Sequence, residues 1–178
     1  MTTEEHEQLV KMARDGRILI GVEPAVARRF FTDPSSENLR KAVGESVAFQ
    51  RLVVLACLLL GPVSLMMSWV LAVFAFGWWG ILAGLVALLA WASYNGRASM
   101  GKQRIIGTAW FLALAIAAGF LGDTYLRFQI WLVAVAASFF FSRLTYYSAV
   151  GFVRSLVLRN RLAFELLSEK ALVVRQVG

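Results

Sequence analysis

Acidic and basic side chains are missing from a long stretch near the middle of this sequence. No Asp, Glu, Lys, Arg or His occurs from Leu52 to Gly96, a run of 45 residues. Of the 178 residues, 59% are apolar and 16% are charged, whereas soluble domains average roughly 25% charged residues. The composition therefore excludes an ordinary soluble domain and indicates an integral membrane protein.

Residues that carry chemistry are scarce. The single cysteine, Cys57, lies in an apolar stretch, so neither an intrachain disulfide nor a thiolate metal cluster can form. The single histidine, His6, precedes the apolar segments, which excludes a bis-histidine haem among them. Between Glu45 and Glu165 the sole carboxylate is Asp123. We therefore expect no enzymatic activity, no cofactor and no metal site.

The chain is basic, with a formal net charge of +7. In a membrane protein such an excess is typical of Lys and Arg that gather on the cytoplasmic side, so we expect no nucleic-acid partner. The first 50 residues hold seven Lys and Arg, one His and eight acidic residues. They lack the apolar segment of a signal peptide, so we expect no cleavage there.

The apolar segments divide into four spans. A bilayer core of roughly 30 Å needs about 20 helical residues, so the uncharged run fits two spans that break at Phe76–Trp79. We interpret Gly61-Pro62 as a kink within the first span. The sequence thus predicts an all-α integral membrane protein with a four-transmembrane-helix bundle, whose spans are 52–76, 79–95, 105–122 and 126–144.

The fourth span leaves an alternative open. In the preferred interpretation, Arg127 and Arg143 lie near opposite interfaces and extend toward water. In the other, Arg143 is a charge inside the membrane, on a helix that runs on to Val153. Such a charge would mark a functional site.

Basic residues predict the orientation. Four spans with both termini on one side place 17 of the 18 Lys and Arg residues on that side and Arg127 alone on the other. This partition follows the positive-inside rule, so both termini are expected in the cytoplasm, and we expect a bacterial inner membrane. The predicted domains are amphipathic amino-terminal helices (1–50), the bundle (51–145) and a cytoplasmic helical extension (146–178).

Small residues at four-residue spacing mark one face of each span. Membrane helices associate through such faces, within one chain or between subunits, and Gly80/Gly84 is the most plausible subunit contact. The first span has Ser64, Ser68 and Ala72. The helix-packing or subunit-interface residues predicted on the other spans are Gly80, Gly84, Ala109, Ala113, Ala117, Ser138 and Ser142.

The amino-terminal segment contains several local signals. Thr2 and Glu5 fit a capping box that opens a helix to about Asp15. The apolar run 18–22 is either a strand or an anchor on the inner surface. A second helix is expected from Pro24 to about Phe31.

A further amphipathic helix is predicted before the first span. Leu39, Val43 and Val47 share one face of it, and it is expected to run into the span. The whole segment is too short and charged to bury a core of its own. Its apolar faces must dock on the membrane surface, the carboxy-terminal helix or another protein.

The carboxy-terminal segment is predicted to be helical. It is either a long continuation of the fourth span or an interfacial helix that bends near Gly151. Arg161 and Glu165 are spaced for an ion pair. Arg154, Arg159 and Arg161 either contact anionic lipid headgroups or form a solvated face. The expected buried residues are Val153, Leu156, Val157, Phe164, Leu167 and Ala171.

Three functions fit this pattern. The first is a non-catalytic membrane subunit or scaffold that binds partner proteins through its packing stripes and cytoplasmic helices. The second is a homo-oligomeric pore, lined by Ser64/Ser68 or Ser138/Ser142, in which Arg143 at the inner mouth favours anions. The third is a protein that binds anionic lipid or senses curvature.

Overall fold

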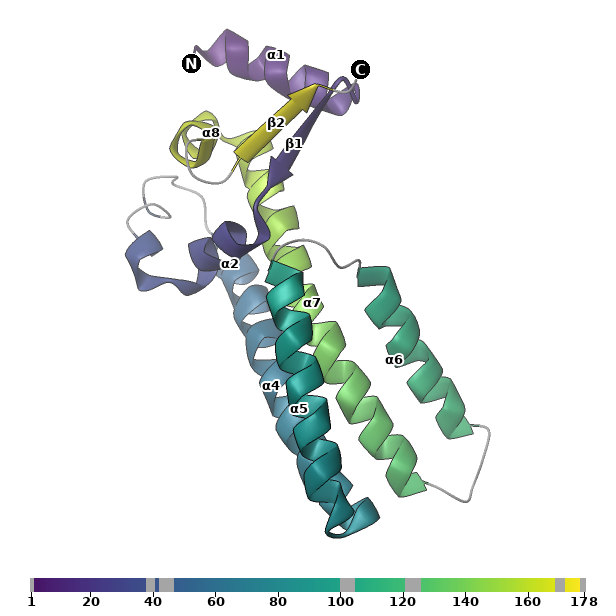
Figure 1. Cartoon of the computed structure of the whole chain (residues 1–178). Helices are drawn as coiled ribbons and strands as arrows, with labels where there is room; N and C mark the ends of the chain where they lie inside the picture. The colour runs from purple at the N-terminus through teal and green to yellow at the C-terminus, as the bar shows by residue number, and fades with distance from the viewer. Residues whose placement is uncertain are drawn as a thin grey trace. The chain divides into compact units, whose positions relative to one another are not determined.

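The computed structural model describes residues 2–37, 41, 47–99, 105–120, 126–168 and 172–176. Helices dominate these residues, and two short strands pair with each other (Figure 1). In chain order the elements are α1 (Thr3–Arg14), β1 (Ile18–Val22), α2 (Pro24–Thr32), the short 3-10 helix η1 (Pro34–Ser36), α4 (Ala48–Phe76), α5 (Trp79–Ser99), α6 (Ile105–Phe120), α7 (Leu126–Arg159), α8 (Arg161–Ser168) and β2 (Leu172–Gln176).

The chain divides into two compact units. The terminal unit joins the two ends of the sequence, Met1–Val54 and Tyr146–Gly178, and the central unit comprises Leu55–Thr145. Helices α4 and α7 contribute residues to both units. The sequence places boundaries at similar positions, 51 and 145, but it treats the two ends as separate appendages rather than as one unit.

Local sequence motifs determine where the first two helices begin and where α1 ends. The Oγ1 of Thr2 accepts a hydrogen bond from the backbone N–H of Glu5 at 3.2 Å, and the Glu5 carboxylate accepts one from the backbone N–H of Thr2 at 2.7 Å. The predicted capping box is therefore confirmed. Gly16 follows α1 with a φ of +73°, a conformation that favours glycine. Pro24 occupies the first position of α2, as predicted.

The two strands form an antiparallel pair in which Ile18 lies opposite Gln176 and Val22 opposite Leu172. A strand was one of the two alternatives for residues 18–22. The protein is mainly helical, as predicted, but strand β2 shows that its carboxy-terminal extension is not helical throughout. The β-branched valines of β2 suit a strand, and its partner comes from the other end of the chain, so no local pattern reveals the pairing.

The long helices run through two residues that often break helices. Helix α4 continues across Pro62, as predicted, and ends before Gly77, whose φ of +58° opens the predicted turn to α5. Helix α7 runs for 34 residues through Gly151. The predicted bend near Gly151 is therefore wrong and the long-helix alternative is correct, with the break at Asn160 instead.

Three helices are long and apolar enough to cross a membrane, namely α4, α5 over Trp79–Arg97, and α7. The fourth apolar helix, α6, is shorter. Its 16 residues extend about 24 Å at 1.5 Å per residue, less than a hydrocarbon core of roughly 30 Å. The last two residues of the predicted span 105–122 lie outside the described part of the chain.

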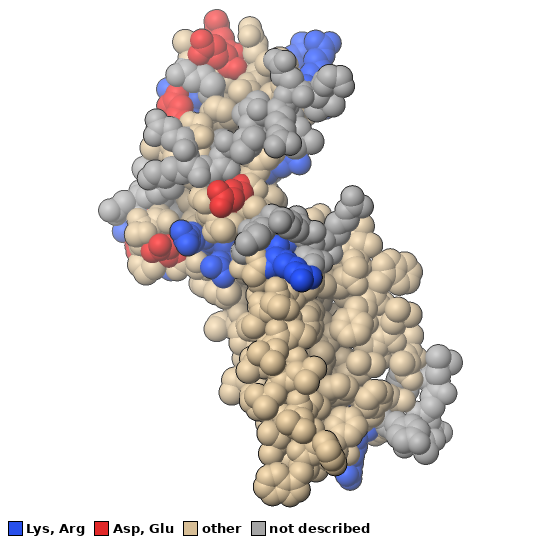
Figure 2. Space-filling model, viewed as in Figure 1, with Lys and Arg blue, Asp and Glu red and all other residues tan. Residues whose placement is uncertain are grey.

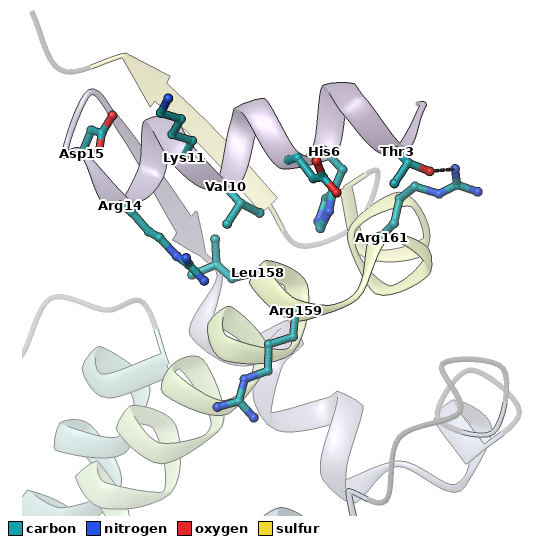
Figure 3. A pocket seen from close by; sticks show the side chains of 10 residues that line it. Thr3, His6, Val10, Lys11, Arg14, Asp15, Leu158, Arg159 and Arg161 are labelled. Carbon is teal, nitrogen blue, oxygen red and sulfur yellow. Dashed lines mark hydrogen bonds between the residues drawn. The ribbon is translucent and has the colours of Figure 1, made fainter.

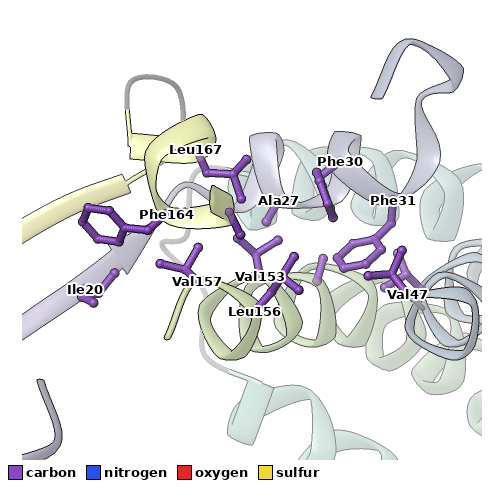
Figure 4. Close-up of a cluster of buried hydrophobic side chains, with 13 residues drawn as sticks. Ile20, Ala27, Phe30, Phe31, Val47, Val153, Leu156, Val157, Phe164 and Leu167 are labelled. Carbon is purple, nitrogen blue, oxygen red and sulfur yellow. The ribbon is translucent and has the colours of Figure 1, made fainter. Parts of the chain in front are cut away.

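The terminal unit has a hydrophobic core of its own, built from both ends of the sequence (Figure 4). The Phe31 side chain of α2 is fully buried and packs edge-to-face on Phe152 of α7, with ring centroids 6.1 Å apart. As expected, the amino-terminal segment does not bury a core of its own, because the core is completed by the carboxy-terminal segment. Of the three docking alternatives, the observed one is the carboxy-terminal helix.

Most of the predicted carboxy-terminal buried face is confirmed. Its buried members are Val153, Leu156, Val157, Phe164 and Leu167, while Ala171 lies outside the described residues. The predicted Arg161–Glu165 ion pair is present at 3.7 Å.

The predicted helix ahead of the first span does not run unbroken into that span. Val47 is buried but lies outside any helix, and α4 begins at Ala48. Leu39 and Val43 lie outside the described residues.

Candidate functional site

Buried residues, most of them small, line the facing sides of α4 and α5. They recur every three or four positions, the spacing that brings two helices into regular contact. The buried positions are Cys57, Gly61, Leu65, Ser68 and Ala72 on α4 and Gly80, Gly84 and Ala87 on α5.

The predicted pair Gly80 and Gly84 faces α4 of the same chain. A Cβ added to Gly80 would collide with the backbone of Ala72, and one added to Gly84 would collide with the ring of Trp69. Close approach of α4 and α5 therefore requires glycine at both positions. The face that carries these residues is already occupied within the chain.

The predicted alanine stripe of α6 points elsewhere. Ala109, Ala113 and Ala117 are exposed. Among the residues of α6 whose burial is described, Thr108 and Ala115 are buried, on a different face. The three alanines are therefore not covered by the described part of the chain, and their role as a subunit contact stays a prediction.

Hydrogen bonds join α5 and α7 of the central unit at a point that α4 approaches closely. The Trp91 Nε1 of α5 donates to the Ser142 Oγ of α7 at 2.8 Å, and the Ser142 Oγ donates to the Ser138 carbonyl oxygen at 2.7 Å. A Cβ added to Gly61 of α4 would lie 2.8 Å from the same Ser142 Oγ. Ser138 and Ser142 thus lie at a close contact of α4, α5 and α7.

The serines proposed for the first span differ in burial. Ser68 is fully buried and donates to the Leu65 carbonyl oxygen at 2.7 Å. Ser64 is half-buried. Ser68 therefore satisfies its hydroxyl on its own helix, as serines in apolar helices commonly do.

Arg143 is a buried charge on α7. Its exposed fraction is 9%, and it interacts electrostatically with Tyr94 of α5, which lies close to Thr108 of α6. Helix α7 continues beyond Val153 to Arg159, as the alternative interpretation of the fourth span requires. Tyr94 of α5 therefore lies between the polar side chains of Arg143 on α7 and Thr108 on α6.

The buried side chain of His6 connects α1 to the core of the terminal unit. It is 7% exposed, its Nε2 lies 3.1 Å from the Val157 carbonyl oxygen, and its ring packs edge-on against Phe164 at 6.0 Å. Because a carbonyl oxygen only accepts, the Nε2 carries the hydrogen. The sequence gives His6 no role, since its partners come from the other end of the chain.

A cleft of about 610 Å³ lies in the terminal unit between α1 and the junction of α7 and α8 (Figure 3). Arg159 and Arg161, two of the three predicted headgroup-binding residues, line this cleft, and Arg161 donates to the Thr3 Oγ1 at 3.2 Å. The third, Arg154, is exposed on α7 outside the lining. The structure therefore separates these three arginines into two groups.

Charged residues gather on the elements of the terminal unit, while the visible face of the central helices is almost wholly uncharged (Figure 2). Within the described parts of the chain, no three His, Cys, Asp or Glu side chains come together as metal ligands. These features define a mainly helical protein with apolar helices long enough to cross a membrane and a separate folded unit made from its two ends. No protein-family model, curated protein or solved structure matches the chain.

Proposed function

We propose that the chain crosses a membrane four times, with α6 as the third span. The two ends of the sequence share one hydrophobic core, and segments that pack together lie on the same side of a bilayer. An even number of crossings must then separate them. The three long helices alone would give an odd number, so parity supports a crossing by the shorter helix α6.

Charge supports an orientation with both ends in the cytoplasm, in a bacterial inner membrane. In this arrangement all but one of the 18 Lys and Arg residues lie on the inner side. The turn between α4 and α5 carries Trp78 and Trp79, which are 86% and 73% exposed. Exposed tryptophans are typical of the membrane interface, so this turn fits the outer boundary.

Within this topology, we propose a non-catalytic subunit or scaffold that binds another membrane helix. The observation that carries the proposal is the exposed stripe of Ala109, Ala113 and Ala117 on α6. Small side chains let helix backbones approach closely in lipid. The glycines of α5 already serve contacts with α4, so the α6 stripe is the better candidate for contact with a second copy or another membrane protein.

A homo-oligomeric pore is less well supported. A path between subunits is lined by residues on the outer face of each bundle, whereas Ser68 and Ser138 are fully buried inside one chain. Their hydroxyls donate to carbonyl oxygens of their own helices, at Leu65 and Val135. These serines therefore fit packing better than ion conduction.

The mass of the complex extracted in mild detergent tests the scaffold proposal. We expect the wild-type protein to exceed the mass of one chain. The Ala113→Leu variant should lose the added mass, because a bulky side chain replaces the methyl group at the close contact. The Ala90→Leu variant makes the same change at an exposed position of α5 and should keep the added mass.

Either kind of added mass supports the proposal. A whole multiple of the chain mass identifies a second copy, and any other mass identifies a different protein. A wild-type protein that migrates as a single chain contradicts the proposal, as does an equal effect of the two leucine substitutions.

A further inference from the structure

The cleft of the terminal unit has the size and mixed surface of a ligand site. Its volume of about 610 Å³ lies within the range typical of small-molecule pockets. Val10 of α1 and Leu158 of α7 give it an apolar part, and Thr3 and His6 lie on the same side of α1 (Figure 3). Apolar surface is therefore available to a ligand, whereas Thr3 and His6 already make hydrogen bonds with Arg161 and Val157.

Positive charge predominates around this cleft. Basic side chains outnumber acidic ones by four to two, so the cleft attracts anions. The Arg14 side chain extends from α1 toward Leu158 (Figure 3). The basic residues are Lys11, Arg14, Arg159 and Arg161, and the acidic residues are Glu7 and Asp15.

The arginines differ in what they already contact. Arg161 donates to Thr3 and pairs with Glu165, so its guanidinium joins α8 to α1 and shapes one end of the cleft. Arg14 and Arg159 are exposed and lie in the last turns of α1 and α7. Guanidinium groups match the oxygens of phosphate through paired hydrogen bonds.

From the charge, volume and apolar lining we infer that this cleft binds a phosphate-bearing ligand, with Arg14 and Arg159 contacting the phosphate. The phosphate belongs either to a lipid headgroup or to a free phosphorylated molecule. The inference does not depend on the proposed scaffold function, because it concerns residues of the terminal unit alone.

Arg154 offers a matched control for surface charge. It lies on α7 as Arg159 does, it is exposed, and it does not line the cleft. General attraction of anions to a basic surface predicts equal effects of neutralising Arg154 and Arg159. A defined cleft predicts that only Arg159 matters.

Native mass spectrometry of the full-length protein in detergent provides the test. The protein is titrated in one arm with pyrophosphate and in the other with phosphatidic acid, and phosphatidylcholine serves as the lipid control. We expect binding in at least one arm and a loss of affinity of about tenfold in the Arg14→Gln and Arg159→Gln variants, the effect of one charge-assisted contact. The Arg154→Gln variant should bind as the wild type does.

The two arms distinguish the sources of the phosphate. Binding of pyrophosphate identifies a free phosphorylated ligand, and binding of phosphatidic acid alone identifies a headgroup. Absence of binding in both arms overturns the inference. An equal loss in the Arg154→Gln and Arg159→Gln variants also overturns it, because the surface charge alone would then explain the binding.

Discussion

Replacing Phe31 by alanine is expected to lower the free energy of unfolding of the terminal unit by about 3–5 kcal/mol. The Phe31 side chain is fully buried. Its ring packs edge-to-face on Phe30 at 5.0 Å and on Phe152 at 6.1 Å. Alanine would leave a cavity between α2 and α7. Since a small domain is stable by only about 5–15 kcal/mol, much of the stability of this unit should be lost.

Pulse proteolysis of the full-length protein in urea measures this effect. The Phe49→Ala variant is the matched control, because Phe49 is 73% exposed and its loss leaves no cavity. In the Phe31→Ala variant, α2 and α8 should become sensitive to protease at the same urea concentration. Loss of protection in α2 while α8 stays protected would show that the two ends do not share a core.

The Gly80→Ala substitution is expected to lower the free energy of unfolding by about 1–3 kcal/mol, because it disturbs the packing of α4 against α5. A Cβ on Gly80 collides with the backbone of Ala72. Backbone atoms cannot rotate away as the end of a side chain can, so the two helices must separate. The Gly80→Ala variant in detergent should therefore unfold at a lower denaturant concentration than the wild type, as followed by tryptophan fluorescence.

The Gly107→Ala variant makes the same substitution where there is space. Nothing lies within 4 Å of a Cβ added to Gly107 in helix α6. Alanine favours a helix over glycine by up to about 1 kcal/mol, so this variant should be as stable as the wild type or slightly more stable. If both alanine variants have equal stability, the close contact between α4 and α5 does not exist.

The sequence best predicted the local features, whose structure depends on residues that are close together in the chain. The capping box of Thr2 and Glu5, the turn at Gly77 and the continuity of α4 across Pro62 are all present. Each depends on residues within one turn of helix or one chain reversal. Helical periodicity also identified the buried face of α7 and α8, including Val153.

Long-range pairing could not be predicted in the same way. Periodicity showed that Leu156 and Phe164 face a core, but it did not show that α2 of the opposite end completes that core. Strand β2 pairs with β1 across almost the whole chain. The buried role of His6 depends on the same association, because its partners, Val157 and Phe164, lie on α7 and α8.

The sequence also could not predict which face of each apolar helix packs against its neighbours. A helix that is apolar all round has no polar face to contrast with a buried one, so its sequence does not show which side packs inward. On α6 the small residues predicted an inward face with Ala113, but Ala113 is exposed while Thr108, on another face, is buried. On α5 the chosen face, with Gly84, is buried against α4.

The sidedness of three positions tests the central claim, which is that the chain crosses the membrane four times with its ends on one side. Single cysteines are introduced by Glu4→Cys, Trp79→Cys and Asp123→Cys in a Cys57→Ser background and treated with an impermeant maleimide on intact cells. Positions 79 and 123 should react from outside, and position 4 should react only after the membrane is opened. Failure of position 123 to react from outside, or reaction of position 4 in intact cells, would contradict the account.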